Sequence, residues 1–263
     1  MQRGIEPRRR SKSIPLPKSV DLNRTALLLD VDGTLLDIAS TPDGVVVPAS
    51  LNATLERLLA QTGGTVALVS GRTIPTLDRL FHPLKLPAIG GHGAEMRFVP
   101  EASVVRRHPP GLSDAIREKL HALAEIDPRL LVEDKQHSIA VHYRLALQQE
   151  PLLEKEIAVI IADEPGDEIE VLPGKAVIEI KPSKFNKGVA VHALMDHAPF
   201  LGRKPIFIGD DTTDEAVFAI LPGLRGVGFS VGRAMPGADG VIPSPEHVRT
   251  WLAHLATSAE RIP

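Results

Sequence analysis

The chain has no cysteine, one tryptophan and one tyrosine among its 263 residues. Without cysteine there can be no disulfide framework, no zinc site built on thiolates and no cysteine nucleophile, and a reducing cytoplasm is the expected location. No apolar run approaches the roughly 18 to 20 residues that span a bilayer, and the N-terminus lacks the apolar stretch of a secretory signal. We therefore expect a soluble, cytoplasmic protein with no membrane partner.

The charge balance is also near neutral. The 30 Lys and Arg residues against 33 Asp and Glu residues leave a formal net charge of -3, which gives no general reason to expect a nucleic-acid partner. With 43% hydrophobic residues the chain can bury a full core, and its length suggests two domains at roughly 100 to 200 residues each. Residues 1–22 are basic and proline-bearing without periodicity, so we expect a disordered tail there rather than a nucleic-acid-binding arm.

Two stretches of the chain predict an α/β core. Residues 25–29 (TALLL) form a short apolar run, residues 50–62 carry leucines at helical spacing before Gly63 and Gly64, and residues 65–70 form a second apolar run. Strand, helix and strand within this distance predict a parallel βαβ unit. A helix at 187–198, an apolar strand that ends in an acidic loop and a helix, and a short strand within 223–232 repeat this arrangement near the C-terminus.

The segment between these halves has a different pattern. Helical periodicity at 112–123 and around 151–161 accompanies period-two alternation in SIAVHYR and AVIEIK, with a hairpin-like segment at 168–182. Such alternation predicts antiparallel strands with one face covered by the two helices. We therefore expect an inserted α+β domain at 107–182 in a core formed by 23–106 and 183–263.

Asp30 and Asp32 follow the first predicted strand directly. Two carboxylates at the carboxyl end of a buried strand occupy the place where open parallel sheets bind ligands. The alternative is that the Asp-Gly pair only makes a turn.

Ser70, Lys187 and the run GDDTTDE occupy similar places in the predicted fold. Ser70 ends a strand and could hold a phosphoryl oxygen, or it could cap a helix. Lys187 stands at a helix start, where a cation is unfavourable unless an anion binds nearby, although an exposed lysine at such a place is common. The acids of GDDTTDE could cap a helix, or Asp210 could join Asp30 and Asp32 at a magnesium site built from oxygen ligands.

The four segments DVDGTL (30–35), SGR (70–72), NKG (186–188) and GDDTTDE (209–215) resemble the ordered motifs of the haloacid dehalogenase superfamily. GGHGAE (90–95), VEDKQHSIAVHYR (132–144) and GKAVIEIKP (174–182) further resemble the trehalose-6-phosphate phosphatase family. The chain departs from that pattern at Val31, where tyrosine is frequent, and in EIKP, where EIRP is common. The resemblance implies a Rossmann-like haloacid dehalogenase core with an α/β cap that closes on the substrate.

The resemblance also implies a reaction, the last step of trehalose biosynthesis, in which trehalose 6-phosphate is hydrolysed with Mg²⁺ through an aspartyl-phosphate. Asp30 would be the nucleophile, Asp32 the general acid and then base, and Ser70 and Lys187 would hold phosphoryl oxygens. Asp30, the main-chain carbonyl of Asp32 and Asp210 would hold the metal, with Asp214 in support and Asp211 ambiguous.

The substrate-binding residues implied by the resemblance come from both domains. They are Asp30, Asp32, Gly33, Thr34, Ser70 and Arg72 in the core, and Glu133, Lys135, His142, Arg144, Lys175 and Glu179 in the cap. Taken singly, each cap residue could instead belong to a solvated, salt-bridged strand face. With so few aromatic residues, charged hydrogen bonds rather than ring stacking should recognise the sugar.

Rival functions follow from what the core motifs leave open. Another haloacid dehalogenase sugar-phosphate phosphatase, such as a sucrose-phosphate phosphatase, or a phosphomannomutase-like enzyme would share the core, and only the cap would distinguish them. A catalytically silent sugar-phosphate-binding module would lack a nucleophile and metal ligands, whereas Asp30 and Asp210 are both present. The run GLRGVGFSVG does not have the spacing of a dinucleotide-binding loop. We expect a monomer that acts on a small molecule.

Overall fold

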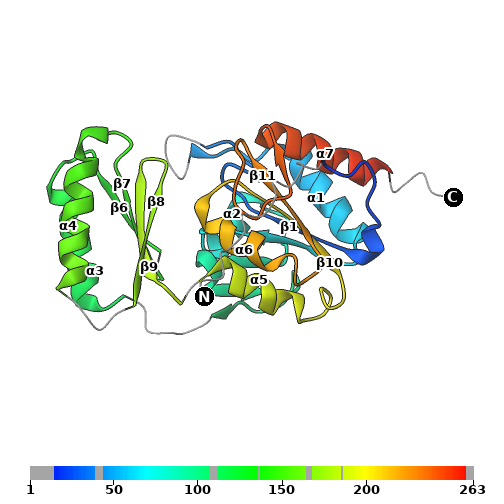
Figure 1. Ribbon diagram of the computed structural model, residues 1–263, viewed down its shortest axis with the longest axis horizontal. Helices are drawn as coiled ribbons and strands as arrows, with labels where there is room; N and C mark the ends of the chain where they lie inside the picture. Colours follow the sequence, from blue (N-terminus) through cyan, green and yellow to red (C-terminus); the bar gives the residue numbers. More distant parts are fainter. Residues whose placement is uncertain are drawn as a thin grey trace, which may run out of the picture.

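The computed structural model describes residues 15–38, 44–106, 112–135, 137–163, 168–184 and 186–258. Within these residues the chain forms an eight-stranded sheet and a four-stranded sheet, each with its own helices (Figure 1). The smaller unit is built from the middle of the sequence and the larger one from both sides of it. The predicted fold class, an α/β core with an inserted α+β unit, is confirmed. We call the two units the core and the cap.

The core sheet is parallel over six strands and antiparallel at one edge. In spatial order its strands are β12 (Gly240–Ile242), β11 (Val227–Val231), β10 (Lys204–Gly209), β1 (Thr25–Leu29), β2 (Val66–Val69), β3 (Ala88–Gly90), β4 (Glu95–Arg97) and β5 (Val105–Arg106). The pairings from β12 to β3 are parallel, and β4 and β5 add antiparallel strands that the sequence did not predict.

Helices cover both faces of this sheet. One face carries α1 (Ala49–Gln61), α2 (Ile74–Leu80) and α7 (Pro245–Ser258), and the other carries α5 (Lys187–Met195) and α6 (Glu215–Ile220). Alternate side chains of β1 pack into these two layers, with Leu27 and Leu29 on one side and Ala26 and Leu28 on the other. A central strand buried on both faces must be apolar at successive positions, which explains the run TALLL.

The strand order reverses between β1 and β10. From β1 the chain passes through α1 to β2 on one side, whereas β10, far later in the sequence, pairs with β1 on the other side. Ligands of open parallel sheets bind outside the carboxyl ends of the strands at such a reversal. Asp30 and Asp210, the residues directly after β1 and β10, therefore stand where a ligand is expected.

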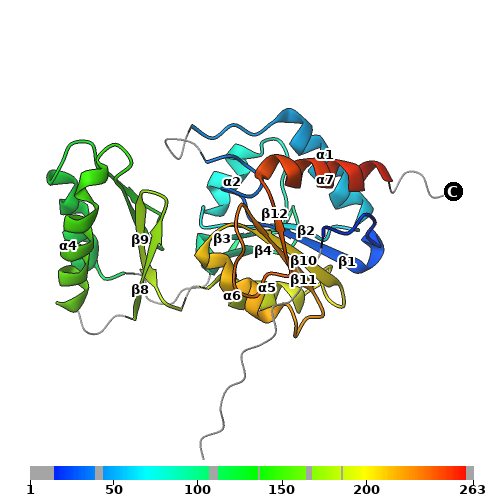
Figure 2. The same ribbon diagram turned by 45° about the horizontal axis from the view of Figure 1, so that its top comes forward.

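The cap sheet is antiparallel, with its helices on one side (Figures 1 and 2). Its strands are, in spatial order, β6 (Leu131–Asp134), β7 (Ile139–His142), β9 (Val177–Pro182) and β8 (Ile169–Gly174), and its helices are α3 (Asp114–Ala122) and α4 (Glu150–Ala162). Ile178 and Ile180 of β9 pack beneath the helices. Because side chains alternate along a strand, Glu179 and Lys181 lie on the opposite face, toward the core.

The predicted N-terminal tail is only partly within the described residues. Residues 1–14 lie outside them, whereas Leu16 and Val20 pack against the core. The indole Nε1 of Trp251 on α7 donates to the carbonyl of Pro17 at 2.9 Å. Residues 15–22 therefore belong with the core rather than with the predicted tail.

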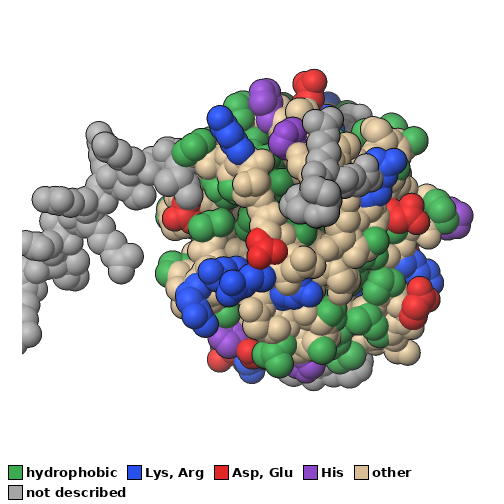
Figure 3. All heavy atoms as spheres, turned by 90° about the vertical axis from the view of Figure 1, so that its right-hand side faces the viewer, with side chains coloured by type: hydrophobic (Ala, Val, Ile, Leu, Met, Phe, Trp, Pro, Cys, Tyr) green, Lys and Arg blue, Asp and Glu red, His purple; other side chains and the backbone are tan. Residues whose placement is uncertain are grey.

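The exposed surface agrees with the near-neutral composition. The end of the core that points away from the cap carries acidic, basic and hydrophobic side chains in a mixed pattern (Figure 3). Among the described residues, none of the helices combines the length and the apolar character that crossing a bilayer requires.

Candidate active site

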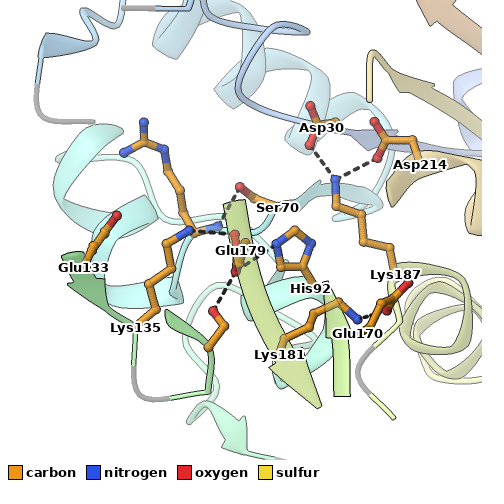
Figure 4. A network of polar contacts seen from close by, with 12 residues as sticks. Asp30, Ser70, His92, Glu133, Lys135, Glu170, Glu179, Lys181, Lys187 and Asp214 are labelled. Atoms are coloured by element: carbon orange, nitrogen blue, oxygen red, sulfur yellow. Dashed lines mark hydrogen bonds and ion pairs between the residues drawn. The ribbon is translucent and has the colours of Figure 1, made fainter. Parts of the chain in front are cut away.

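Asp30 and Lys187 form a buried ion pair at the carboxyl end of β1. Lys187 Nζ lies 2.9 Å from Asp30 Oδ1 and 2.7 Å from Asp214 Oδ1 (Figure 4). The side chains of Asp30 and Lys187 are only 6% and 3% exposed. Burial raises the pKa of Asp30 well above its usual range, although the charge of Lys187 acts in the opposite direction. One ammonium thus offsets only part of the negative charge gathered at this point.

Lys187 occupies a helix position that is unfavourable for a cation. It is the first residue of α5, and the side chain of Asn186 caps the helix by accepting the N–H of Gly188 at 2.7 Å. A cation there opposes the helix dipole. Burial acts to lower the pKa of Lys187, but Asp214 and Asp30 outweigh it and raise this pKa above its ordinary value. The ion pairs therefore hold a charged ammonium at the end of the sheet.

Asp30, Asp210 and Asp214 form a cluster of buried carboxylates. One oxygen from each lies within 4.8 Å of the others. Asp214 Oδ2 accepts the N–H groups of Asp210 at 2.9 Å and Asp211 at 3.0 Å, and Oδ1 accepts from Lys187. Asp210 Oδ1, by contrast, is buried and has no hydrogen-bond partner among the described residues. Asp214 thus organises the cluster, and Asp210 still has an oxygen to offer a ligand.

The close approach of Asp210 depends on Gly33. Gly33 has a φ of +82°, and a Cβ at this position would come 2.1 Å from Asp210 Oδ2. Burial raises the pKa of Asp210, with the charge of Lys175 acting in the opposite direction. Buried carboxylates with raised pKa values and an unpartnered oxygen fit a hard divalent cation such as Mg²⁺, which would favour their ionised forms.

Asp32 makes a bidentate ion pair with Arg72. Arg72 Nε donates to Asp32 Oδ2 at 2.6 Å, and Nη2 donates to Oδ1 at 2.8 Å. The Asp32 side chain is 38% exposed, so a ligand can reach it. The pair joins the loop after β1 to the loop after β2, and the sequence predicted both residues as site residues without predicting their contact.

Ser70 also follows β2. The sequence allowed two roles for it, a helix cap or a phosphoryl ligand, and the structure tests the first. The N-cap of α2 is Thr73, so the alternative that Ser70 caps this helix is wrong. Its Oγ accepts the N–H of Arg72 at 3.1 Å, and the residue faces the cavity described below. Binding of a phosphoryl oxygen by Ser70 stays a prediction.

Glu179 on β9 is the point where several polar groups of the cap and core meet. Lys135 Nζ lies 3.0 Å from Oε2, Ser138 Oγ donates to Oε1 at 2.6 Å, and His92 Nε2 lies 3.2 Å from Oε1 (Figure 4). Burial acts to raise the pKa of Glu179, but the charges of His92 and Lys135 and the hydrogen bonds hold it well below its usual range. Glu179 is therefore an ionised carboxylate with a fixed orientation.

The remaining predicted cap residues lie beside the same space. His142 Nε2 lies 3.0 Å from Glu133 Oε2, and this hydrogen bond holds the pKa of Glu133 below its usual value. Lys175, in the turn between β8 and β9, is 70% exposed and its Nζ lies 3.3 Å from Asp210 Oδ2. Arg144 Nη2 donates to the Lys175 carbonyl at 3.0 Å. Lys175 thus connects the cap to the carboxylate cluster of the core.

One cavity of about 440 Å³ between cap and core brings most of the predicted residues together. Its walls include Asp30, Asp32, Ser70, Arg72, Glu133, Lys135, His142, Arg144, Lys175, Glu179, Lys187 and Asp210. Three predicted residues, Gly33, Thr34 and Asp214, are buried without lining it. The N–H of Gly33 donates to the Leu36 carbonyl at 2.8 Å, which closes the turn after the aspartates.

The sequence analysis missed several residues of the cavity wall. His92 comes from the loop between β3 and β4, Glu95 is the first residue of β4, Arg129 precedes β6 and Leu131 begins it. The available signal for His92 was a histidine set between glycines in GGHG, in a segment noted only for its resemblance. Arg129 and Leu131 carried no such signal, because an arginine before a strand and a leucine at its start are common.

Comparisons with known proteins find relatives that cover most of the chain. Residues 28–234 match the family described as trehalose-phosphatase. The chain is 42% identical over 242 residues to the probable trehalose-phosphate phosphatase of Sinorhizobium fredii, a match that covers 90% of each chain. It is 35% identical over 248 residues to the trehalose-6-phosphate phosphatase of Escherichia coli, covering 94% of this chain and 92% of that one.

The fold has a similar solved relative. The C-terminal domain of the Candida albicans trehalose-6-phosphate phosphatase has a TM-score of 0.80 to this chain at 23% sequence identity, covering 95% of this chain and 99% of that one. At this identity the likeness supports the arrangement of core and cap and nothing finer.

Proposed function

This chain belongs to the trehalose-phosphatase family, and we propose that it hydrolyses trehalose 6-phosphate to trehalose and inorganic phosphate through an aspartyl-phosphate on Asp30. One observation carries the proposal. A single cavity has Asp30, Lys187 and Asp210 on its core wall and Glu133, Lys135 and Glu179 on its cap wall. The core wall suits a phosphoryl group, and the cap wall offers charged hydrogen-bonding groups to sugar hydroxyls.

In the proposed reaction Asp30 and Asp32 have different tasks. A carboxylate oxygen of Asp30 forms a bond to phosphorus as the bond from phosphorus to the sugar oxygen breaks, and a proton on Asp32 passes to that oxygen. A water then attacks the phosphorus and gives its proton to Asp32, while the bond from phosphorus to Asp30 breaks. Inorganic phosphate leaves, and both side chains return to their starting states.

Asp32 must carry a proton when the ester bond breaks, whereas in the described arrangement both of its carboxyl oxygens accept hydrogen bonds from Arg72. The anionic phosphoryl group would compete with Asp32 for the guanidinium, which binds phosphate as readily as carboxylate. Release of Arg72 would leave the carboxyl oxygens of Asp32, whose side chain is 38% exposed, open to the leaving sugar oxygen. Arg72 thus has two anionic partners in the proposed cycle, and binding of the substrate selects between them.

The chain also offers a place for Mg²⁺. We assign Asp30, Asp210 and the main-chain carbonyl of Asp32 to hold it, with Asp214 fixing their positions through Lys187 and the backbone. When bound, the ion would neutralise charge on the phosphoryl group. Ser70 and Lys187 would bind the non-bridging oxygens.

The cap would confer the substrate preference. We propose that residues 107–182 act as a unit that closes over the core formed by 23–106 and 183–263, and that closure excludes water and aligns the sugar. Another sugar-phosphate phosphatase of the same superfamily remains the alternative, because the core residues do not encode the sugar. A monomeric state and a cytoplasmic location stay predictions.

Substitutions in the cap test the substrate. Glu133→Ala, Lys175→Ala or Glu179→Ala should each lower kcat/KM for trehalose 6-phosphate about ten- to a hundredfold, the effect of losing a charged hydrogen bond of about 1.5 to 3 kcal/mol. Hydrolysis of p-nitrophenyl phosphate, which is too small to need the cap, should be largely spared.

Glu118→Ala on α3 and Lys155→Ala on α4, on the helical side of the cap, serve as matched controls and should change neither substrate. Thermal melts would show whether each variant is folded. Normal hydrolysis of trehalose 6-phosphate by all three cavity variants would rule out the proposed role of the cap, and another sugar phosphate would become the better candidate.

A further inference from the structure

The loop between β3 and β4, residues 91–94, presents His92 to the cap from a constrained backbone. His92 has a φ of +53° and a ψ of +25°, in the left-handed region that residues other than glycine seldom adopt. The residue is only 7% exposed. Backbone strain of this kind, of about 1 to 3 kcal/mol, persists where the surrounding structure imposes it, often at functional sites.

The imidazole ring of His92 is fitted against the loop that carries Ser70 and Arg72. A Cβ on Gly71 would come 2.4 Å from His92 Nε2, so the ring can occupy this place only beside a glycine. Neither ring nitrogen makes a hydrogen bond of good geometry to the described residues. The nearest carboxylate oxygen is Glu179 Oε1, which lies 3.2 Å from Nε2 (Figure 4).

The contact between His92 and Glu179 crosses from the core to the cap. The other two groups on Glu179, Lys135 and Ser138, belong to the cap itself and would accompany Glu179 if the cap moved. Of these three contacts to Glu179, only the one with His92 would be broken if the cap moved away from the core. Without His92, Glu179 would keep its two cap partners but lose the contact that ties its carboxylate to the core.

A second histidine contact beside the first crosses in the opposite direction. His137 of the cap has its Nε2 3.7 Å from Oε1 of Glu95 in the core. Glu95 is 1% exposed, and its Oε2 accepts the N–H of Ile74 at the start of α2 at 2.7 Å. The core segment 91–95 thus contacts the cap at two places, through His92 at one and through Glu95 at the other.

We propose that His92 is a positioning residue, which orients Glu179 toward the substrate only when the cap is closed on the core. The inference rests on the proposed function, since it assumes that Glu179 binds the sugar. Glu179 lines the cavity, and His92 of the core lies 3.2 Å from its Oε1. Substrates that engage the cap should depend on His92, and small phosphoesters should not.

Two variants separate the imidazole from the backbone that carries it. Asparagine tolerates the left-handed backbone but is too short to reach Glu179, so His92→Asn should raise KM and lower kcat/KM for trehalose 6-phosphate about tenfold or more. Hydrolysis of p-nitrophenyl phosphate should change by less than about threefold. His92→Gln, whose amide nitrogen can take the place of Nε2, should recover a clear part of the loss. Lys155→Ala, at an exposed lysine of α4 that does not line the cavity, is the control and should have no effect.

A double-mutant cycle tests whether His92 acts through Glu179. If it does, His92→Asn combined with Glu179→Ala should be no slower on trehalose 6-phosphate than Glu179→Ala alone, because the residue to be oriented is already gone. Multiplicative losses would mean that His92 contacts the substrate itself and would overturn the proposal, as would a normal KM in His92→Asn. Failure of the wild-type enzyme to hydrolyse trehalose 6-phosphate would instead overturn the proposed function.

Discussion

Asp30→Asn should abolish turnover and leave the fold intact. The amide is nearly the same size as the carboxylate but cannot form an acyl phosphate with phosphorus. Lys187 would keep its contact with Asp214 at 2.7 Å, so the end of the sheet should stay ordered. We expect less than about a hundredth of the wild-type kcat, which corresponds to an activation barrier that is higher by about 3 kcal/mol or more.

Phosphate release and circular dichroism, measured on the same sample, would check this expectation. Asp37→Asn is a suitable control, because Asp37 lies in the same loop, is 72% exposed and pairs with Arg249 at 3.2 Å. It should keep nearly full activity. If Asp30→Asn retained more than about a hundredth of the wild-type kcat, covalent catalysis at Asp30 would be wrong.

Removal of divalent metal should also abolish activity. Asp30 and Asp210 are buried carboxylates with raised pKa values, and Asp210 Oδ1 has no partner among the described residues. A bound cation would favour their ionised forms, which the nucleophile needs. Enzyme stripped with a chelator should therefore be inactive, and Mg²⁺ should restore it.

Stability provides a readout of this site that does not depend on catalysis. A ligand that binds the folded state raises the free energy of unfolding, so Mg²⁺ should raise the Tm of the stripped wild type. Asp210→Asn should abolish that rise, whereas Asp211→Asn, which changes a residue outside the buried cluster, should keep it. Full activity after chelation, or the same rise in Tm for Asp210→Asn and the wild type, would contradict the assignment.

Four neighbouring strands of the core, β1, β2, β10 and β11, could be predicted because they are long enough to carry a pattern. TALLL and KPIFIG are apolar runs that end at acidic residues, and both became central parallel strands. β4 and β5 could not be predicted in the same way. β4 reads EMR, and its Glu95 and Arg97 are buried through partners distant in the sequence: the N–H of Ile74 for Glu95, and Asp78 for Arg97. Local polarity alone would place such a segment in a loop.

The site shows the same division between local pattern and distant contact. Asp30, Ser70 and Asp210 each follow a strand. Because the carboxyl ends of parallel strands lie at the same edge of the sheet, a shared location was expected. The contact of Arg72 with Asp32 and that of His92 with Glu179 join loops whose relative placement depends on the whole fold. The sequence shows which side chains are available. Which of them pair when they are 40 or more residues apart in the sequence depends on the tertiary packing.

Phosphate release by the wild-type enzyme over a panel of sugar phosphates, with Mg²⁺ present, is the most direct test of the account. The panel should include trehalose 6-phosphate, sucrose 6-phosphate, glucose 6-phosphate and mannose 6-phosphate at equal concentrations. We predict that trehalose 6-phosphate has the highest kcat/KM, about tenfold or more above the others, because only the matching hydroxyls satisfy the charged cap residues. An equal or higher kcat/KM for any other sugar phosphate in the panel would contradict the proposed function.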